Sequence, residues 1–216
     1  MQALAALRKH PAAVWVGFAL VGLALLALPF ALAHVGTAWV RITNLAFLFV
    51  LLSLGLNIVV GFAGLLDLGY IAFYAVGAYT YALLASPHFN IHLPFWIILP
   101  IGAAIACLFG VLLGTPTLKL RGDYLAIVTL GFGEIVRIFF NNLSQPFNLT
   151  NGPQGITLID PFHIGDFSFA KTDVFLGLSF SGPIKYYYLL TLVLLAVIVV
   201  NLRLQDSRLG RAWEAI

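Results

Sequence analysis

Long runs of apolar residues, separated by short polar connections, constrain this 216-residue chain more than any other feature. The longest run extends from Thr43 to Ala85 and holds one charged residue, Asp67. A transmembrane helix needs about 20 apolar residues, so this run is long enough for two crossings. Hydrophobic residues make up 62% of the chain and charged residues 9%, against about 25% charged residues in soluble domains. The sequence therefore predicts an all-α, polytopic helical membrane protein and excludes a soluble or disordered chain.

About six transmembrane spans are predicted from these runs, because each span takes roughly 20 residues. Glycines in Gly61–Gly69 divide the longest run, since glycine adopts backbone angles that other residues avoid. The predicted spans are Ala12–Ala33, Thr43–Val60, Gly64–Ala85, Pro94–Leu113, Tyr124–Phe140 and Tyr186–Leu202. Two alternatives stay open. The first concerns Ala31–Ala33, which is similar to a signal-peptide cleavage site, although the run before it is long for a signal peptide. The second concerns Gly61–Gly69, which is either a turn or a helix break at mid-membrane depth.

The distribution of Lys and Arg predicts the orientation in the bilayer. If the N-terminus is cytoplasmic, the inside holds most of the 11 basic residues, and Arg137 lies within a span. The inside residues are Arg8, Lys9, Lys119, Arg121, Arg203, Arg208 and Arg211, and the outside ones are Arg41, Lys171 and Lys185. This excess follows the positive-inside rule. It predicts that both ends are cytoplasmic and that residues 141–185 form an external loop. It also explains the net charge of +3 without a nucleic-acid partner.

Sequence motifs of catalysis are absent. The chain has no GxxxxGK[ST] phosphate loop, no GxSxG nucleophile elbow and no HExxH metal motif. Its single cysteine, Cys107, cannot form an intramolecular disulfide. Within the apolar runs the titratable residues are few, and the principal ones are Asp67, Glu134 and Arg137. We therefore expect a transport protein with no catalytic residue and no metal site, whose energy comes from ions or from a partner subunit.

Four ordered stretches resemble the ABC-importer permeases for branched-chain amino acids, of the LivM type. They are Gly55–Gly69 with Phe73 and Gly77–Tyr79, Leu120–Arg137, Leu149–Ile156, and Leu209–Ile216. The resemblance extends from Asn44 to Ile216 and implies a permease subunit that moves leucine, isoleucine or valine across the bacterial cytoplasmic (inner) membrane by alternating access. One departure is Asn151-Gly152, where the family often has Gly-Gly.

The resemblance also implies partners and a coupling element. The partners are a second permease subunit, an external substrate-binding protein and two ATP-binding subunits, which hold ATP and Mg²⁺, so this chain itself holds no cofactor. Residues 203–216 would begin a cytoplasmic loop that docks onto an ATPase subunit, with coupling residues Arg208, Gly210, Arg211, Ala212, Trp213, Glu214 and Ala215. Because family members continue beyond this loop, residues 1–216 are expected to be a fragment of a single transmembrane permease domain.

Six residues are candidates for the substrate pathway or for a helix break within it: Gly61, Gly64, Asp67, Gly69, Glu134 and Arg137. Asp67 lies either near the pathway or at a cytoplasmic turn, because an ionised carboxylate in lipid is costly. Glu134 and Arg137 are three residues apart and share a helical face. We expect a structural ion pair there, and the alternative is that the two residues meet the ammonium and carboxylate of the amino acid.

Two other functions remain open. Related permeases carry urea or short amides, and the motifs do not separate these substrates from amino acids. An ion-coupled secondary transporter would use intramembrane carboxylates, for which Asp67 and Glu134 are the candidates.

Overall fold

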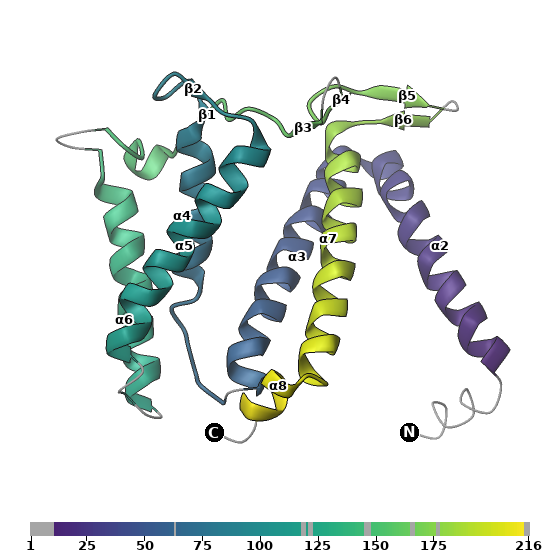
Figure 1. The fold of residues 1–216 in the computed structure, drawn as a ribbon. Helices are drawn as coiled ribbons and strands as arrows, with labels where there is room; N and C mark the ends of the chain where they lie inside the picture. The colour runs from purple at the N-terminus through teal and green to yellow at the C-terminus, as the bar shows by residue number, and fades with distance from the viewer. Residues whose placement is uncertain are drawn as a thin grey trace. The chain divides into compact units, whose positions relative to one another are not determined.

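The computed structural model describes residues 11–62, 64–117, 120, 123–144, 148–164, 167–175 and 178–213. Most of them are helical (Figure 1). The helices are α2 (Pro11–Val35), α3 (Thr37–Asn57), the π-helix η1 (Ile58–Phe62), α4 (Ile71–Leu84), α5 (Phe95–Thr117), α6 (Asp123–Asn142), the 3₁₀ turn η2 (Gly152–Gln154), α7 (Gly182–Gln205) and α8 (Arg208–Trp213). The strands form three antiparallel hairpins: β1 (Ala85–Ser86) with β2 (Ile91–His92), β3 (His163–Ile164) with β4 (Phe167–Ser168), and β5 (Asp173–Phe175) with β6 (Leu178–Phe180).

Within the described ranges, four helices are long and apolar enough to cross a membrane. They are Thr37–Gly61, Phe95–Leu112, Tyr124–Asn142 and Gly182–Gln205, and the shorter apolar helices are Ala19–Val35 and Ile71–Leu84. These six segments follow the predicted order, and the all-α, polytopic fold class is confirmed.

Two predicted boundaries are wrong. The second span begins at Thr37 instead of Thr43, since Gly36 alone interrupts the helices and Arg41 lies inside α3 with an exposed side chain. A long basic side chain can extend along the helix to reach a polar environment, so one arginine does not end a span. The third span is helical only from Ile71, although Gly64 was the predicted start.

The chain divides into two compact units, Met1–Phe49 with Thr172–Leu194 and Val50–Lys171 with Leu195–Ile216. The first unit has a small core in which Val40, Ile184 and Tyr187 are buried. Phe47 packs on Tyr187 with ring centroids 5.1 Å apart. Aromatic and aliphatic side chains from α2, α3 and α7 surround this core and hold the three segments together.

A proline in α2 explains one contact of this core. Pro29 has no amide hydrogen, so the carbonyl four residues before it, that of Leu25, loses its helical hydrogen bond. The Tyr187 hydroxyl donates to the Leu25 carbonyl at 3.0 Å, and Tyr188 donates to the Leu26 carbonyl at 2.7 Å. The Tyr187 hydroxyl therefore satisfies the acceptor that the proline leaves free, and Tyr188 makes a second bond at the next carbonyl.

Lys185 was predicted to end the external loop, but the structure places it in a helix. It is in the first turn of α7, which begins at Gly182, and its side chain is only 3% exposed. Its Nζ is 2.6 Å from Oδ2 of Asp173 on β5. Burial of an ammonium group requires such a partner, so the β5–β6 hairpin compensates this charge.

In the second unit, α4, α5 and α6 pack side by side (Figure 1). The chain from Gly64 to Asp67 is extended, and α4 begins only after Gly69 and Tyr70. Gly64 has a φ of +64°, a left-handed conformation that favours glycine. The glycine-rich segment is therefore a helix break and not the first turns of a span.

This extended segment crosses α6 at Thr129. The Leu68 amide donates to Thr129 Oγ1 at 3.0 Å. A Cβ on Gly69 would lie only 2.5 Å from the Thr129 carbonyl oxygen, and a Cβ on Gly133 would lie 3.6 Å from the Gly69 Cα. Thr129 is six residues after the start of α6, about 9 Å along its axis at 1.5 Å per residue. The break thus lies beside the second turn of a candidate span, and inside a membrane irregular backbone is tolerated only against protein or a cavity.

The polar region after α6 folds against the ends of α4 and α5. The Asp160 amide donates to the Ala85 carbonyl at 2.7 Å, and the Tyr81 hydroxyl donates to the Asp160 carbonyl at 2.9 Å. His92 Nδ1 lies 2.5 Å from Oδ2 of Asp160. Phe162 is buried and stacks edge-on against Phe95 at 4.6 Å. Residues 148–164 are therefore a structured part of this unit.

Gly69→Ala should destabilise the complete transporter by about 1–3 kcal/mol, because the added methyl group would overlap backbone and not a flexible side chain. Gly77→Ala in α4 is the matched control, since a Cβ there meets no atom within 4 Å. The midpoint of thermal aggregation in detergent measures the difference. Equal midpoints for the two variants would show that the crossing at Thr129 is not tightly packed.

Candidate functional site

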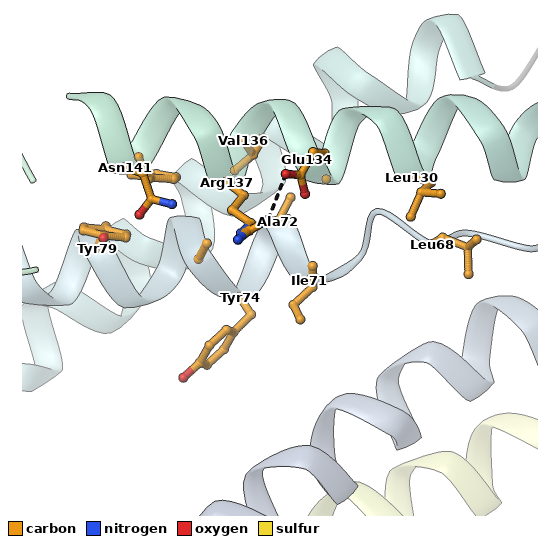
Figure 2. Close-up of a pocket in the computed structure, with 13 residues that line it drawn as sticks. Leu68, Ile71, Ala72, Tyr74, Tyr79, Leu130, Glu134, Val136, Arg137 and Asn141 are labelled. Atoms are coloured by element: carbon orange, nitrogen blue, oxygen red, sulfur yellow. Dashed lines mark hydrogen bonds and ion pairs between the residues drawn. The ribbon is translucent and has the colours of Figure 1, made fainter. Parts of the chain in front are cut away.

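A cavity of about 390 Å³ lies between α4 and α6, directly beyond the crossing at Thr129 (Figure 2). Small and apolar side chains of both helices make up most of its wall. The lining residues are Leu68, Ile71, Ala72, Tyr74, Ala75, Tyr79, Leu130, Gly133, Glu134, Val136, Arg137, Phe140 and Asn141. The alanines and Gly133 leave the space, because no large side chain fills it from those positions.

Glu134 and Arg137 supply the charges of this cavity wall. The Arg137 guanidinium donates to Glu134 Oε1 at 2.8 Å, as Figure 2 shows. The predicted ion pair between these residues is confirmed. Their side chains are 53% and 71% exposed, so the pair is accessible to a ligand. Such exposed pairs contribute at most about 1 kcal/mol of stability in water.

Aromatic and amide groups mark the end of the cavity farthest from the crossing. Tyr79 and Phe140 stack face to face with ring centroids 4.3 Å apart. Asn141, in the last turn of α6, also lines this end. None of these three residues was a predicted site residue. Tyr79 belongs to the motif Gly77–Tyr79, but the spacing of a motif within one helix does not reveal a partner on another helix.

A second cavity of about 200 Å³ lies on the other side of the crossing. Its lining residues are Val59, Leu65, Asp67, Gly114, Leu120, Leu125 and Thr129. Asp67 Oδ1 accepts a hydrogen bond from the Gly69 amide at 2.9 Å, a local turn that asparagine and aspartate commonly form. The structure therefore separates Asp67 from Glu134 and Arg137, which line the larger cavity.

The predicted glycines have different local roles. Gly61 lies in the π-helix, where an added Cβ would be 2.6 Å from the Asn57 side-chain oxygen. Gly64 provides the positive φ at the start of the extended segment, and Gly69 provides the close approach to α6. All three thus shape the helix break, and Gly69 also separates the two cavities.

The predicted coupling segment begins with a tight corner between α7 and α8. Ser207 Oγ accepts from the Gly210 amide at 3.0 Å and donates to the Leu204 carbonyl at 2.6 Å. A Cβ on Gly210 would lie 2.3 Å from that same carbonyl oxygen, so only glycine fits. Arg208 and Arg211 are exposed on α8. Of the other predicted coupling residues, Ala212 and Trp213 have a helical backbone, and Glu214 and Ala215 lie outside the described residues.

The third motif, Leu149–Ile156, terminates α6. Thr150 is buried, and its hydroxyl donates to the Phe140 carbonyl at 2.6 Å. Asn151 has a φ of +61° and Gly152 a φ of +59°. Asparagine tolerates this left-handed region better than other side chains. The departure from Gly-Gly at position 151 is therefore compatible with the turn.

Comparisons with known proteins show which family the chain is similar to. Residues 38–216 match the family described as branched-chain amino acid transport system, permease component. The high-affinity branched-chain amino acid transport system permease protein LivM of Escherichia coli K12 is 47% identical over 190 residues, which are 82% of this chain and 43% of that protein. The protein of the same name from Salmonella typhimurium LT2 is 43% identical over 207 residues, which are 86% of this chain and 47% of that protein.

The chain thus spans less than half the length of these relatives. No solved structure matches the chain. The family match nevertheless covers the helix break, both cavities and the corner at Gly210. This chain therefore belongs to the family of permease components of branched-chain amino acid transport systems.

Proposed function

We propose that this chain is a permease subunit of an ATP-driven importer that moves leucine, isoleucine or valine across the cytoplasmic membrane by alternating access. The observation that carries the proposal is the family match over residues 38–216, together with 47% identity to a permease named for branched-chain amino acids. The larger cavity supports it, since ligand pockets commonly measure about 300–1,000 Å³ and are mostly apolar.

The larger cavity has the chemistry that an aliphatic amino acid requires. Ile71, Leu130 and Val136 provide apolar surface for the side chain. The Glu134–Arg137 pair neutralises its own charges, which lets both residues lie at membrane depth without a large desolvation cost. We assign the pair to the wall of the pathway, with Gly61, Gly64, Asp67 and Gly69 forming the helix break beside it.

Energy would come from partners, and this chain would hold no cofactor. Two ATP-binding subunits would bind ATP and Mg²⁺, a second permease subunit would complete the pathway, and an external binding protein would deliver the amino acid. Residues 208–215 would dock onto an ATPase subunit, because a short helix in a partner's groove is a common mode of recognition. The rigid corner at Gly210 supports this assignment, since it fixes the direction of α8 relative to the end of α7.

The orientation proposed here places α8 in the cytoplasm and residues 148–164 outside. The excess of Lys and Arg on the proposed inner side supports it. The bacterial inner membrane is the corresponding location. The hydrogen bonds of Asp160 to Ala85 and Tyr81 would give the external binding protein a fixed docking surface.

Uptake of labelled leucine by cells with and without the complete gene tests the substrate. Deletion should abolish low-concentration leucine uptake, and excess unlabelled valine should compete for it in the parent. Excess urea is the control competitor and should have no effect. If leucine uptake persists and urea uptake falls, the substrate class is urea or short amides. Uptake that continues without the ATPase subunits but requires an ion gradient would indicate a secondary transporter.

Glu134→Gln alone should lower leucine uptake at least about fivefold, because it leaves Arg137 without a counter-charge at membrane depth. The double variant Glu134→Gln/Arg137→Gln should recover most of that loss, since neither charge remains. Initial uptake rates over a range of leucine concentrations give KM and the maximal rate for each. A double variant as impaired as the single one, with a raised KM, would instead assign the two residues to direct contact with the amino acid.

Gly210→Ala in the complete transporter should uncouple ATP hydrolysis from uptake, because the methyl group would overlap the Leu204 carbonyl and turn α8 away. Gly131→Ala is the matched control, since a Cβ on Gly131 meets no atom within 4 Å. The measurement is the number of leucine molecules imported per ATP hydrolysed. An unchanged ratio in Gly210→Ala would remove the corner from the coupling mechanism.

A further inference from the structure

The two cavities lie one after the other along α6. The smaller one is lined by Leu125 and Thr129 of this helix, and the larger one by residues from Leu130 to Asn141. On the opposing segment the order is the same, since Leu65 and Asp67 line the smaller cavity and Leu68 and Ile71 line the larger. The two cavities therefore lie on either side of the crossing at Thr129.

We propose that the crossing of Leu68–Gly69 with Thr129 and Gly133 is the barrier of the transport pathway, and that its separation joins the two cavities. The inference rests on the proposed transport function. It adds the position of the barrier and the residues that close it. The barrier is held shut by a hydrogen bond and by the close approach of the two backbones, and not by a large side chain.

The contacts at the crossing fit a barrier that can open. One hydrogen bond between segments, from the Leu68 amide to Thr129 Oγ1, joins the two sides at 3.0 Å. The Thr129 hydroxyl also has a bond within its own helix, to the Ala126 carbonyl at 3.2 Å, so it keeps a partner when the crossing separates. The net contribution of a single hydrogen bond of this kind is small enough for thermal opening.

The extended segment is also suited to movement. Residues 64–67 are not helical, and two of their amides make single backbone hydrogen bonds, Leu65 to the Val59 carbonyl at 3.3 Å and Asp67 to the Leu65 carbonyl at 3.1 Å. Helix α4 starts directly after the segment, with the Ala72 amide donating to the Gly69 carbonyl at 2.9 Å. This bond ties Gly69 to the first turn of α4, so a displacement of Leu68 and Gly69 would carry that turn with it. Gly64, with its positive φ and no atom within 4 Å of an added Cβ, can serve as the hinge.

Cysteine accessibility in the complete transporter, reconstituted in vesicles with every native cysteine replaced, Cys107 included, tests the barrier. Ala75→Cys reports on the larger cavity. Gly114→Cys reports on the smaller one, and its Cβ meets no atom within 4 Å. A charged, membrane-impermeant methanethiosulfonate is added on the side where Asn141 lies. Ala75→Cys should react at least about tenfold faster than Gly114→Cys, the ratio expected for a barrier closed by about 1.4 kcal/mol.

Three threonine variants then identify the contact that closes the barrier. Thr129→Val should raise the labelling rate of Gly114→Cys about tenfold, because the Leu68 amide loses its acceptor. Thr129→Ser keeps the hydroxyl and should leave labelling slow. Thr80→Val is the matched control, since Thr80 is a buried threonine with a bond to its own helix, to Val76 at 2.7 Å, but lies away from the crossing.

Two results would overturn the barrier. One is equal labelling of Ala75→Cys and Gly114→Cys before the threonine is changed. The other is a labelling rate of Gly114→Cys that Thr129→Val leaves unchanged. Leucine uptake by the parent vesicles is measured in parallel. Absence of uptake from the parent contradicts the proposed function, whereas uptake in the parent with either labelling result above contradicts only the barrier.

Discussion

The close approach between the backbone of Gly69 and the carbonyl of Thr129 is the constraint on which the second unit depends. It allows an extended segment to lie against a helix that is long and apolar enough to cross a membrane, where an unpaired amide would be costly. The Leu68 amide finds its acceptor in Thr129 Oγ1 at 3.0 Å. Glycine at 69 and at 133 lets the two backbones approach closely. The two cavities lie on either side of this contact.

Periodicity and composition were sufficient for the helices but not for their interruption. Apolar runs predicted the fold class and five of the six segments to within a few residues at most ends, since lipid imposes a simple length requirement. The segment Gly64–Tyr70 was assigned to the third span, while a turn or a helix break at Gly61–Gly69 was left open, because glycine allows either. Only the partner on α6, Thr129, makes the extended conformation favourable, and it is 61 residues away from Leu68 in sequence.

The candidate site was predictable to the extent that its members share one helix. Glu134 and Arg137 are three residues apart, so their pairing follows from helical geometry. Tyr79, Phe140 and Thr129 meet their partners across different elements, which sequence spacing does not encode. The separation of Asp67 from the Glu134–Arg137 pair likewise depends on the direction of the extended backbone. Glycines carried the strongest signal, because each of Gly64, Gly69 and Gly210 has a conformation or contact that excludes a side chain.

Pro29 has a consequence for the rotational freedom of α2. When all backbone groups of an apolar helix are bonded within the helix, its faces are chemically alike. Such a helix can rotate about its axis or slide past a neighbour without losing a polar contact. The proline leaves one polar acceptor, the carbonyl of Leu25, without its helical donor on the surface of α2, and the carbonyl of Leu26 lies next to it. Tyr187 and Tyr188 bind them from α7. A rotation or a shift of one turn would leave the Leu25 carbonyl without a donor, so the proline defines one register between the two helices.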